Sequence, residues 1–179
     1  VLSSADIKDG TVSAVVGTSG AYYVKVDPGY YIQSGDTYTL TATTSASSGN
    51  NETESNDSIS TADDLTSGVA ISGQSSSTSD NDYYKIAATA GQEISISFDG
   101  TTSVSYARWS VDIVDGSGNV LSSADVVDGS VKAVVGSTGT YYVKVDPQVG
   151  IQSGDTYSLT ATTATASGNN ETESNDSIS

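Results

Sequence analysis

The chain contains no cysteine, no histidine and no methionine among its 179 residues. Without cysteine it has neither a disulfide framework nor a thiolate metal site. Without histidine the Ser-His, Cys-His and zinc-water catalytic systems are excluded. A carboxylate pair is the remaining acid–base option, but Glu93 is the only one of the five glutamates outside two acidic stretches. The sequence therefore predicts a protein that is not an enzyme.

Positive charge is also scarce, with 6 Lys and Arg against 22 Asp and Glu and a formal net charge of −16. Such a chain repels phosphate backbones and anionic lipid surfaces. Long apolar runs are absent too, since none approaches the roughly 20 residues that span a bilayer. These features predict that the protein binds no nucleic acid and does not insert into a membrane.

The most informative feature present is an internal repeat. The acidic stretch NNETESNDSIS occurs at residues 50–60 and again, unchanged, at 169–179, a spacing of 169 − 50 = 119 residues. At this offset 46 of the 60 overlapping positions are identical without a gap. The chain therefore holds one and a half periods of a tandem array. Residues 1–49 are expected to be the C-terminal half of a preceding repeat, 50–163 a complete repeat, and 164–179 a linker with the acidic stretch of the next.

Short stretches of alternating apolar and polar residues separated by turn signals predict β-strands. In the complete repeat they are Ile71–Gly73, Tyr83–Ala88, Ile94–Phe98, Trp109–Ile113, a strand from Val120, Val131–Val135, Tyr141–Val145 and Tyr157–Ala161. The half repeat shows the same alternation at Val12–Val16, Tyr22–Val26 and Tyr38–Ala42. We expect an all-β fold, an antiparallel β-sandwich of about eight strands per 119-residue repeat with jelly-roll-like connectivity.

Three local features complete this expectation. Ser60–Leu65 is the one segment with helical character, and Asp115–Asn119 is expected to be a hairpin turn. Trp109 alternates with Val111 and is expected in the core. The paired tyrosines, such as Tyr83-Tyr84 and Tyr141-Tyr142, are expected to place one ring in the core and one toward solvent.

The order of several motifs is similar to that of a known family. They are E-x-E-x-N-D at Glu52–Asp57, a strand ending in Gly73, SDNDYYKI at Ser79–Ile86, AGQEISI at Ala90–Ile96, and later DGSGNVL and TGTYYVKV. This order resembles the bacterial pre-peptidase C-terminal domain, a β-sandwich module that includes the collagen-binding domains of clostridial collagenases. The resemblance covers residues 50–163. The segment Asp146–Gly150 departs from the aromatic collagen-facing strand of those domains, so collagen binding is not implied.

In the collagen-binding members, the acidic segment and the D-x-D-Y loop together hold calcium. The resemblance therefore implies a calcium site formed by Glu52, Glu54, Asn56, Asp57, Asp80 and Asp82, with Glu171, Glu173, Asn175 and Asp176 as the incomplete second copy. The chemistry favours the same cation, because Ca²⁺ takes six to eight hard oxygen ligands. An extended backbone would also place Glu52, Glu54 and Asn56 on one face. The alternative is a solvated acidic linker without a metal.

These observations favour a structural module in a secreted bacterial surface adhesin or extracellular fibre, stiffened by calcium at the linker between repeats. Its partners would be neighbouring repeats of the same chain or other copies of itself. The alternative is a polymer-binding module appended to a secreted hydrolase, which would bind collagen or a polysaccharide through exposed tyrosines.

Overall fold

The computed structural model describes residues 10–16, 19–45 and 49–168. Its elements are η1 (Ile59–Thr61), β1 (Asp63–Asp64), β2 (Ala70–Gln74), β3 (Asp82–Ala88), β4 (Gln92–Thr101), β5 (Trp109–Val114), β6 (Val120–Val126), β7 (Asp128–Val134), β8 (Gly139–Pro147) and β9 (Thr156–Thr165). In this described part of the chain, no helix has the length and apolar character needed to cross a bilayer.

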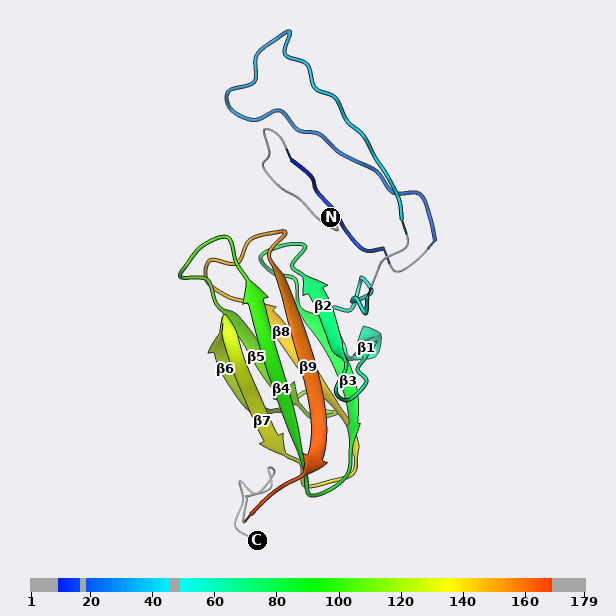
Figure 1. The fold of residues 1–179 in the computed structure, drawn as a ribbon, viewed down its shortest axis with the longest axis vertical. Coiled ribbons are helices and arrows are strands. Elements are labelled where there is room, and N and C mark those ends of the chain that lie inside the picture. The colour runs from blue at the N-terminus through cyan, green and yellow to red at the C-terminus, as the bar shows by residue number, and fades with distance from the viewer. Residues whose placement is uncertain (1–9, 17–18, 46–48, 169–179) are drawn as a thin grey trace.

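The strands form two packed sheets (Figure 1), a five-stranded sheet in the order β1-β3-β8-β5-β6 and a four-stranded sheet in the order β2-β9-β4-β7. Successive strands from β2 to β5 alternate between the two sheets, which is jelly-roll connectivity. Every strand pair except the parallel β1–β3 pair is antiparallel. The predicted all-β sandwich is confirmed, and each of the eight predicted strands is present.

The alternating apolar residues fill the space between the sheets. Trp109 is fully buried and its ring lies 6.0 Å from Phe98 and 5.1 Å from Tyr157. Tyr84 and Tyr141 are buried, whereas their neighbours Tyr83 and Tyr142 are partly exposed, because successive side chains of a strand point to opposite faces. The predictions for Trp109 and for these two tyrosine pairs are confirmed, whereas the same prediction is wrong for Tyr22-Tyr23 and Tyr30-Tyr31, whose rings are all exposed.

The hairpin turn at Asp115–Asn119 is also confirmed. The Asp115 carboxylate accepts hydrogen bonds from the backbone N–H groups of Ser117 at 2.8 Å and Asn119 at 2.9 Å, and Gly118 takes a φ of 85°. The Asp115 side chain therefore stabilises the turn by accepting hydrogen bonds from the turn's own backbone, as Asp and Asn side chains often do.

The helical prediction for Ser60–Leu65 is largely wrong. A single 3₁₀ turn covers Ile59–Thr61, and the chain then becomes extended as β1. The Leu65 N–H donates to the Lys85 carbonyl at 2.9 Å. Pairing with β3 thus replaces the local hydrogen bonds that a helix would need.

The strands predicted for the half repeat are not formed. Residues 10–16 and 19–45, called here the N-terminal arm, contain no strand and are exposed. Tyr22 is 49% exposed, whereas its counterpart Tyr141 is 5% exposed. In the complete repeat, β8 pairs with β3 and β5, and β9 pairs with β2 and β4. Among the described residues there is one set of these partner strands, and it pairs with β8 and β9, so the alternating residues of the arm are left exposed.

Candidate metal centre

The acidic segment, residues 50–60, begins by covering the free edge of β2. The Ser72 N–H donates to the Asn50 carbonyl at 3.0 Å, and the Glu52 N–H donates to the Ser72 carbonyl at 2.9 Å. The Gln74 N–H donates to Glu52 Oε1 at 2.5 Å, and the Asn50 amide donates to the Ala70 carbonyl at 3.2 Å. The edge of the four-stranded sheet is therefore satisfied by the acidic segment.

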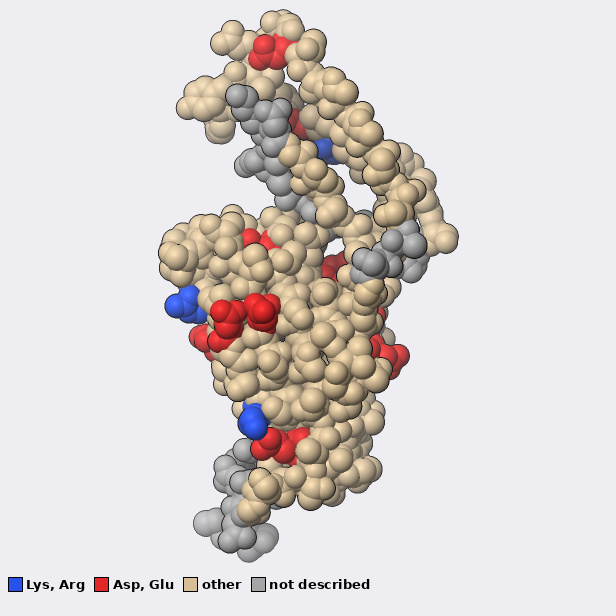
Figure 2. All heavy atoms as spheres, in the orientation of Figure 1, with Lys and Arg blue, Asp and Glu red and all other residues tan. Residues whose placement is uncertain are grey.

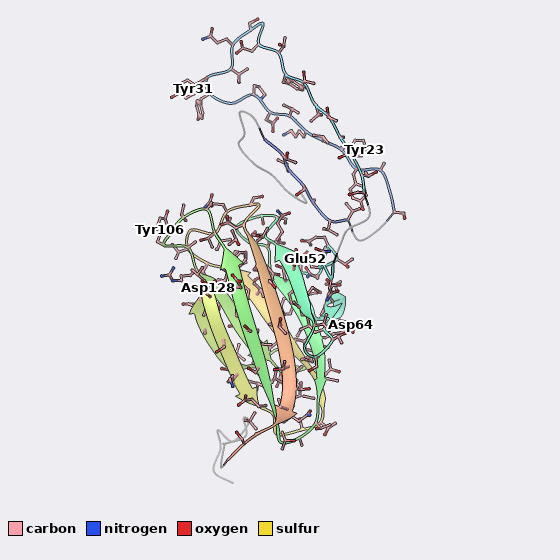
Figure 3. All side chains as sticks on the ribbon, viewed as in Figure 1. Tyr23, Tyr31, Glu52, Asp64, Tyr106 and Asp128 are labelled. Carbon is pink, nitrogen blue, oxygen red and sulfur yellow. The ribbon has the colours of Figure 1, made fainter. Side chains whose placement is uncertain are left out.

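The segment then crosses to the five-stranded sheet, where the Tyr83 N–H donates to the Asn56 carbonyl at 2.9 Å. Along the way Glu52 and Asn56 are buried and Glu54 is half-buried, whereas Thr53 and Ser55 are exposed. The predicted one-sided arrangement is confirmed. The segment joins the edges of both sheets on the side of the sandwich where Glu52 lies beside β2 (Figure 3).

This crossing brings together the five carboxylates predicted in the first copy. They form two groups that share Glu54. Oxygens of Glu52, Glu54 and Asp82 lie within 4.8 Å of one another, and so do oxygens of Glu54, Asp57 and Asp80. The four predicted residues of the second copy, Glu171, Glu173, Asn175 and Asp176, lie outside the described residues.

Two tyrosines from different sheets hold the deepest carboxylates. Tyr84, on β3, donates from its hydroxyl to Glu52 Oε2 at 2.7 Å. The Tyr157 hydroxyl, on β9, donates to Asp82 Oδ2 at 2.6 Å and lies 2.6 Å from the Tyr84 hydroxyl. Gly73 makes room for this contact, because a Cβ there would lie 2.7 Å from Glu52 Oε2 and closer still to the Tyr157 ring. Sequence reasoning missed all three residues, since these contacts span up to 105 positions.

The loop that carries Asp80 is fixed by a separate aspartate. Asp80 Oδ2 accepts from the Ser76 N–H at 2.6 Å. The neighbouring Ser75 N–H donates to the Asp155 carbonyl at 2.9 Å. The buried Asp155 carboxylate itself accepts from the N–H groups of Ser103 and Gln152, each at 2.9 Å. Asp155 was also missed, and it positions the loop beside the cluster.

Burial and mutual repulsion perturb these carboxylates. Burial raises the pKa of Glu52 to about 7, although the hydrogen bonds that this carboxylate accepts lower it. Burial, together with Asp80 and Glu52, raises the pKa of Glu54 to about 7. Burial, reinforced by the charge of Glu52, raises the pKa of Asp82 to about 10, and burial also raises that of Asp80. A group of negative charges this close holds protons unless a cation replaces them.

Among the described residues, no basic side chain forms an ion pair with the cluster. The ion pairs among the described residues are Lys25–Asp27, Lys85–Asp64, Lys132–Glu93 and Lys144–Asp146, and none includes a carboxylate of the cluster. Figure 2 likewise shows few basic side chains on the face it presents.

The unpartnered atoms of the site match a metal. Glu54 Oε1, Asn56 Oδ1 and Asp82 Oδ1 are buried oxygens without a hydrogen-bond partner, and the Asn56 amide nitrogen is unpartnered as well. Buried polar atoms in folded proteins are nearly always satisfied, so such a set needs an explanation. Carboxylate and amide oxygens are the ligands of hard cations. The residues present therefore fit a metal ion.

The cluster also has a route to solvent. A cavity of about 480 Å³ is lined by Glu52 and Glu54, by β2, β4 and β9, and by Ser13–Val15 of the N-terminal arm. A metal site needs such a path for the ion to enter.

Comparison with known proteins gives little beyond the fold. No protein-family model matches the chain, and no curated protein matches it. Among solved structures, the chain is similar to Aeromonas hydrophila PliG, a periplasmic lysozyme inhibitor of g-type lysozyme, at 14% identity. That match covers 56% of this chain and 95% of PliG with a TM-score of 0.44. A likeness this distant carries no functional argument.

Proposed function

We propose that this protein is a calcium-binding structural module of the pre-peptidase C-terminal type, repeated in a secreted bacterial adhesin or extracellular fibre. One observation carries the proposal. A group of five carboxylates, of which Glu52, Asp80 and Asp82 are buried, has no basic partner among the described residues and carries unpartnered oxygens where the acidic segment crosses from one sheet to the other. The role is structural and not catalytic.

Calcium is favoured over other cations by the ligand set. The cluster offers only oxygen atoms, in carboxylates and amides, and the chain has neither the thiolate nor the imidazole that zinc and copper prefer. Ca²⁺ accepts six to eight oxygens in irregular geometry, whereas Mg²⁺ requires a near-octahedral shell and retains water. Two carboxylate groups that share Glu54 suit the more flexible coordination.

A bound cation would strengthen the contacts of the acidic segment. It would neutralise the repulsion between Glu52, Glu54 and Asp82, and would hold the segment against β2 and β3. The segment follows a connector rich in serine, glycine and asparagine, which by itself is flexible. Calcium would then fix the direction in which one unit leaves the next. The acidic segment lies along β2, and β9 ends at the far end of the sandwich (Figure 1), which supports units arranged in line.

Calorimetric titration of the metal-free 179-residue chain with Ca²⁺ tests the proposal. We expect saturable binding and a rise in melting temperature, and terbium luminescence sensitised by Tyr84 and Tyr157 should appear and be displaced by calcium. Glu54→Gln should abolish these signals because Glu54 belongs to both carboxylate groups. Glu93→Gln, which removes a carboxylate paired with Lys132 elsewhere, is the matched control. A metal-free chain with no calcium heat and an unchanged melting curve would contradict the proposal.

A polymer-binding module attached to a secreted hydrolase is the second candidate. It is favoured by Tyr106, which is 63% exposed in a loop at one end of the sandwich (Figure 3). Exposed aromatic rings are frequent contact residues for ligands. Retention on insoluble collagen, chitin or cellulose that is lost in Tyr106→Ala would support this role, whereas no retention would leave the structural role.

A further inference from the structure

One loop changes its character between the two copies of the repeat. Gly29–Tyr31 in the N-terminal arm corresponds, at the 119-residue offset, to Gln148–Gly150 in the complete repeat. Identical stretches bracket this triplet in both copies, YYVKVDP before it and IQSGDTY after it. Tyr30 and Tyr31 are also the only aromatic residues that the overlapping copies do not share. The strands on each side of the loop are therefore constant, whereas the loop itself differs.

In the sandwich this triplet opens the loop from β8 to β9, which lies against the loop from β4 to β5. The Gln148 N–H donates to the Arg108 carbonyl, and the Arg108 N–H donates to the Val149 carbonyl, each at 3.0 Å. Val149 and Tyr106 are each 63% exposed, and Tyr106 marks this end of the sandwich (Figure 3). A rigid scaffold that carries an exposed, variable loop is the usual arrangement of a binding surface.

Gly150 fixes the shape of this end of the sandwich. Its φ is 82°, and a Cβ there would lie 2.9 Å from Tyr106 Cε2 and 3.0 Å from Ala107 Cα. Glycine alone adopts such a conformation without steric cost. A tyrosine at this position, as Tyr31 is in the other copy, would therefore strike the Tyr106 ring and the backbone beside it. The exchange of the triplet changes the shape of this end as well as its composition.

The groups at this end suit a sugar. Beside the exposed ring of Tyr106, Gln148 and Arg108 are exposed, and the Arg108 guanidinium is held by a hydrogen bond of 2.6 Å to the Ala107 carbonyl. A sugar ring presents a face of C–H groups and an edge of hydroxyls, so it can stack on the aromatic ring and bond to an amide and a guanidinium. The net charge of −16 repels acidic polymers. These properties favour a neutral polysaccharide.

We infer that Tyr106 and Gln148–Gly150 form a binding surface for a neutral polysaccharide, and that the triplet determines which polysaccharide each copy of the repeat prefers. Tyr106 supplies the stacking ring that the copies hold in common at this end. The triplet sets the groups around it, with an amide and an aliphatic side chain in one copy and two further aromatic rings in the other. The inference rests on the polymer-binding candidate function and is independent of the calcium site.

Binding isotherms of the full 179-residue chain on insoluble chitin and cellulose test this inference, with carboxymethyl-cellulose resin as the matched acidic polymer. Tyr106→Ala removes the ring. Val149→Tyr introduces the aromatic residue that the other copy has as Tyr30, at a position exposed enough to accept it. Val120→Tyr is the matched control, because Val120 is 56% exposed and pairs with Val114 at the opposite end of β5.

The unaltered chain should be retained on chitin or cellulose and not on the acidic resin. Tyr106→Ala should weaken this retention about tenfold or more, as loss of a central aromatic contact does. Val149→Tyr should change the affinity for at least one neutral polymer by about three- to tenfold, the effect of one aromatic contact. Val120→Tyr should leave both affinities unchanged. Equal melting temperatures would show that each variant keeps the sandwich intact.

The contrary outcomes are separable. Retention that Tyr106→Ala abolishes but Val149→Tyr leaves unchanged would overturn the role of the triplet and leave the polymer-binding candidate standing. Equal retention on the acidic resin would overturn the neutral ligand class, and retention unaffected by Tyr106→Ala would overturn this surface as the site. Absence of retention on both neutral polymers would overturn the inference together with the polymer-binding candidate. Calcium binding should be the same in every variant, because none of the changed residues belongs to the carboxylate cluster.

Discussion

Calcium binding at pH 7 is expected to expel about two protons from the carboxylate cluster. In the metal-free protein, the pKa of Glu52 and that of Glu54 are each raised to about 7, and that of Asp82 to about 10. The causes are burial in each case and repulsion among the carboxylates. At pH 7 the two glutamates therefore hold about half a proton each, and Asp82 holds about one. A bound cation requires all three groups to be ionised, so calcium binding releases the protons that they hold, about two in total.

The released protons are measured by isothermal titration calorimetry at one pH in buffers of different ionisation enthalpy. The slope of the observed heat against that enthalpy gives the number of protons, and the number should fall toward about one when the pH is raised to about 8, because both glutamates are then largely ionised. A slope near zero at pH 7 would show that the cluster is ionised without metal, and the electrostatic account of the site would be wrong.

Asp82→Asn provides the sharpest variant for this measurement. Asn resembles the protonated form that Asp82 has in the metal-free protein, and its amide oxygen can still accept from Tyr157. The metal-free melting temperature should therefore change little. Calcium at a hundredfold above its dissociation constant raises the free energy of unfolding of the unaltered chain by about 2.7 kcal/mol. This stabilisation should be lost in Asp82→Asn. A large loss of metal-free stability would mean that Asp82 is charged in that state.

Three further outcomes are expected. The metal-free chain should lose stability as pH rises from about 4.5 through about 7, because the pKa of Glu52 is about 7 in the folded protein against an ordinary value of 4.5. The loss of free energy of unfolding from this group alone is about 3 kcal/mol. Thermal melts with chelator at pH 5 and pH 8 measure the difference, and equal midpoints would contradict it. Gly73→Ala should lower the free energy of unfolding by about 1–3 kcal/mol, because the added methyl group overpacks against Glu52 and Tyr157. Gly91→Ala has open space around its Cβ position, so it tests the strain of a positive φ without that clash. An unchanged Gly73→Ala midpoint in chemical denaturation would refute the packing account. Tyr157→Phe should lower the free energy of unfolding by about 1–3 kcal/mol, because Asp82 and Glu52 lose a buried hydrogen-bond donor. The same change should weaken calcium binding. A calcium affinity equal to that of the unaltered chain would show that Tyr157 does not position these ligands.

Much of the architecture could be read from the sequence because it depends on local patterns. Period-two alternation located each of the eight predicted strands, and turn residues located the hairpin at Asp115–Asn119. The ligand arm was recognisable because alternate residues of an extended segment share a face, as Glu52, Glu54 and Asn56 do. The strand β1 was missed because two residues are too few to show a period.

The sequence by itself determined the 119-residue repeat, the alternation of the strands and the supply of oxygen ligands, since these are properties of neighbouring residues. Only the tertiary structure decided that Tyr84, Tyr157 and Gly73 shape the carboxylate cluster, because they come from separate strands that pairing brings together. It also decided that the same alternating sequence is a buried strand at Tyr141–Val145 and an exposed arm at Tyr22–Val26. A strand exists only where another strand satisfies its backbone and a second sheet covers its apolar face, and neither condition is local.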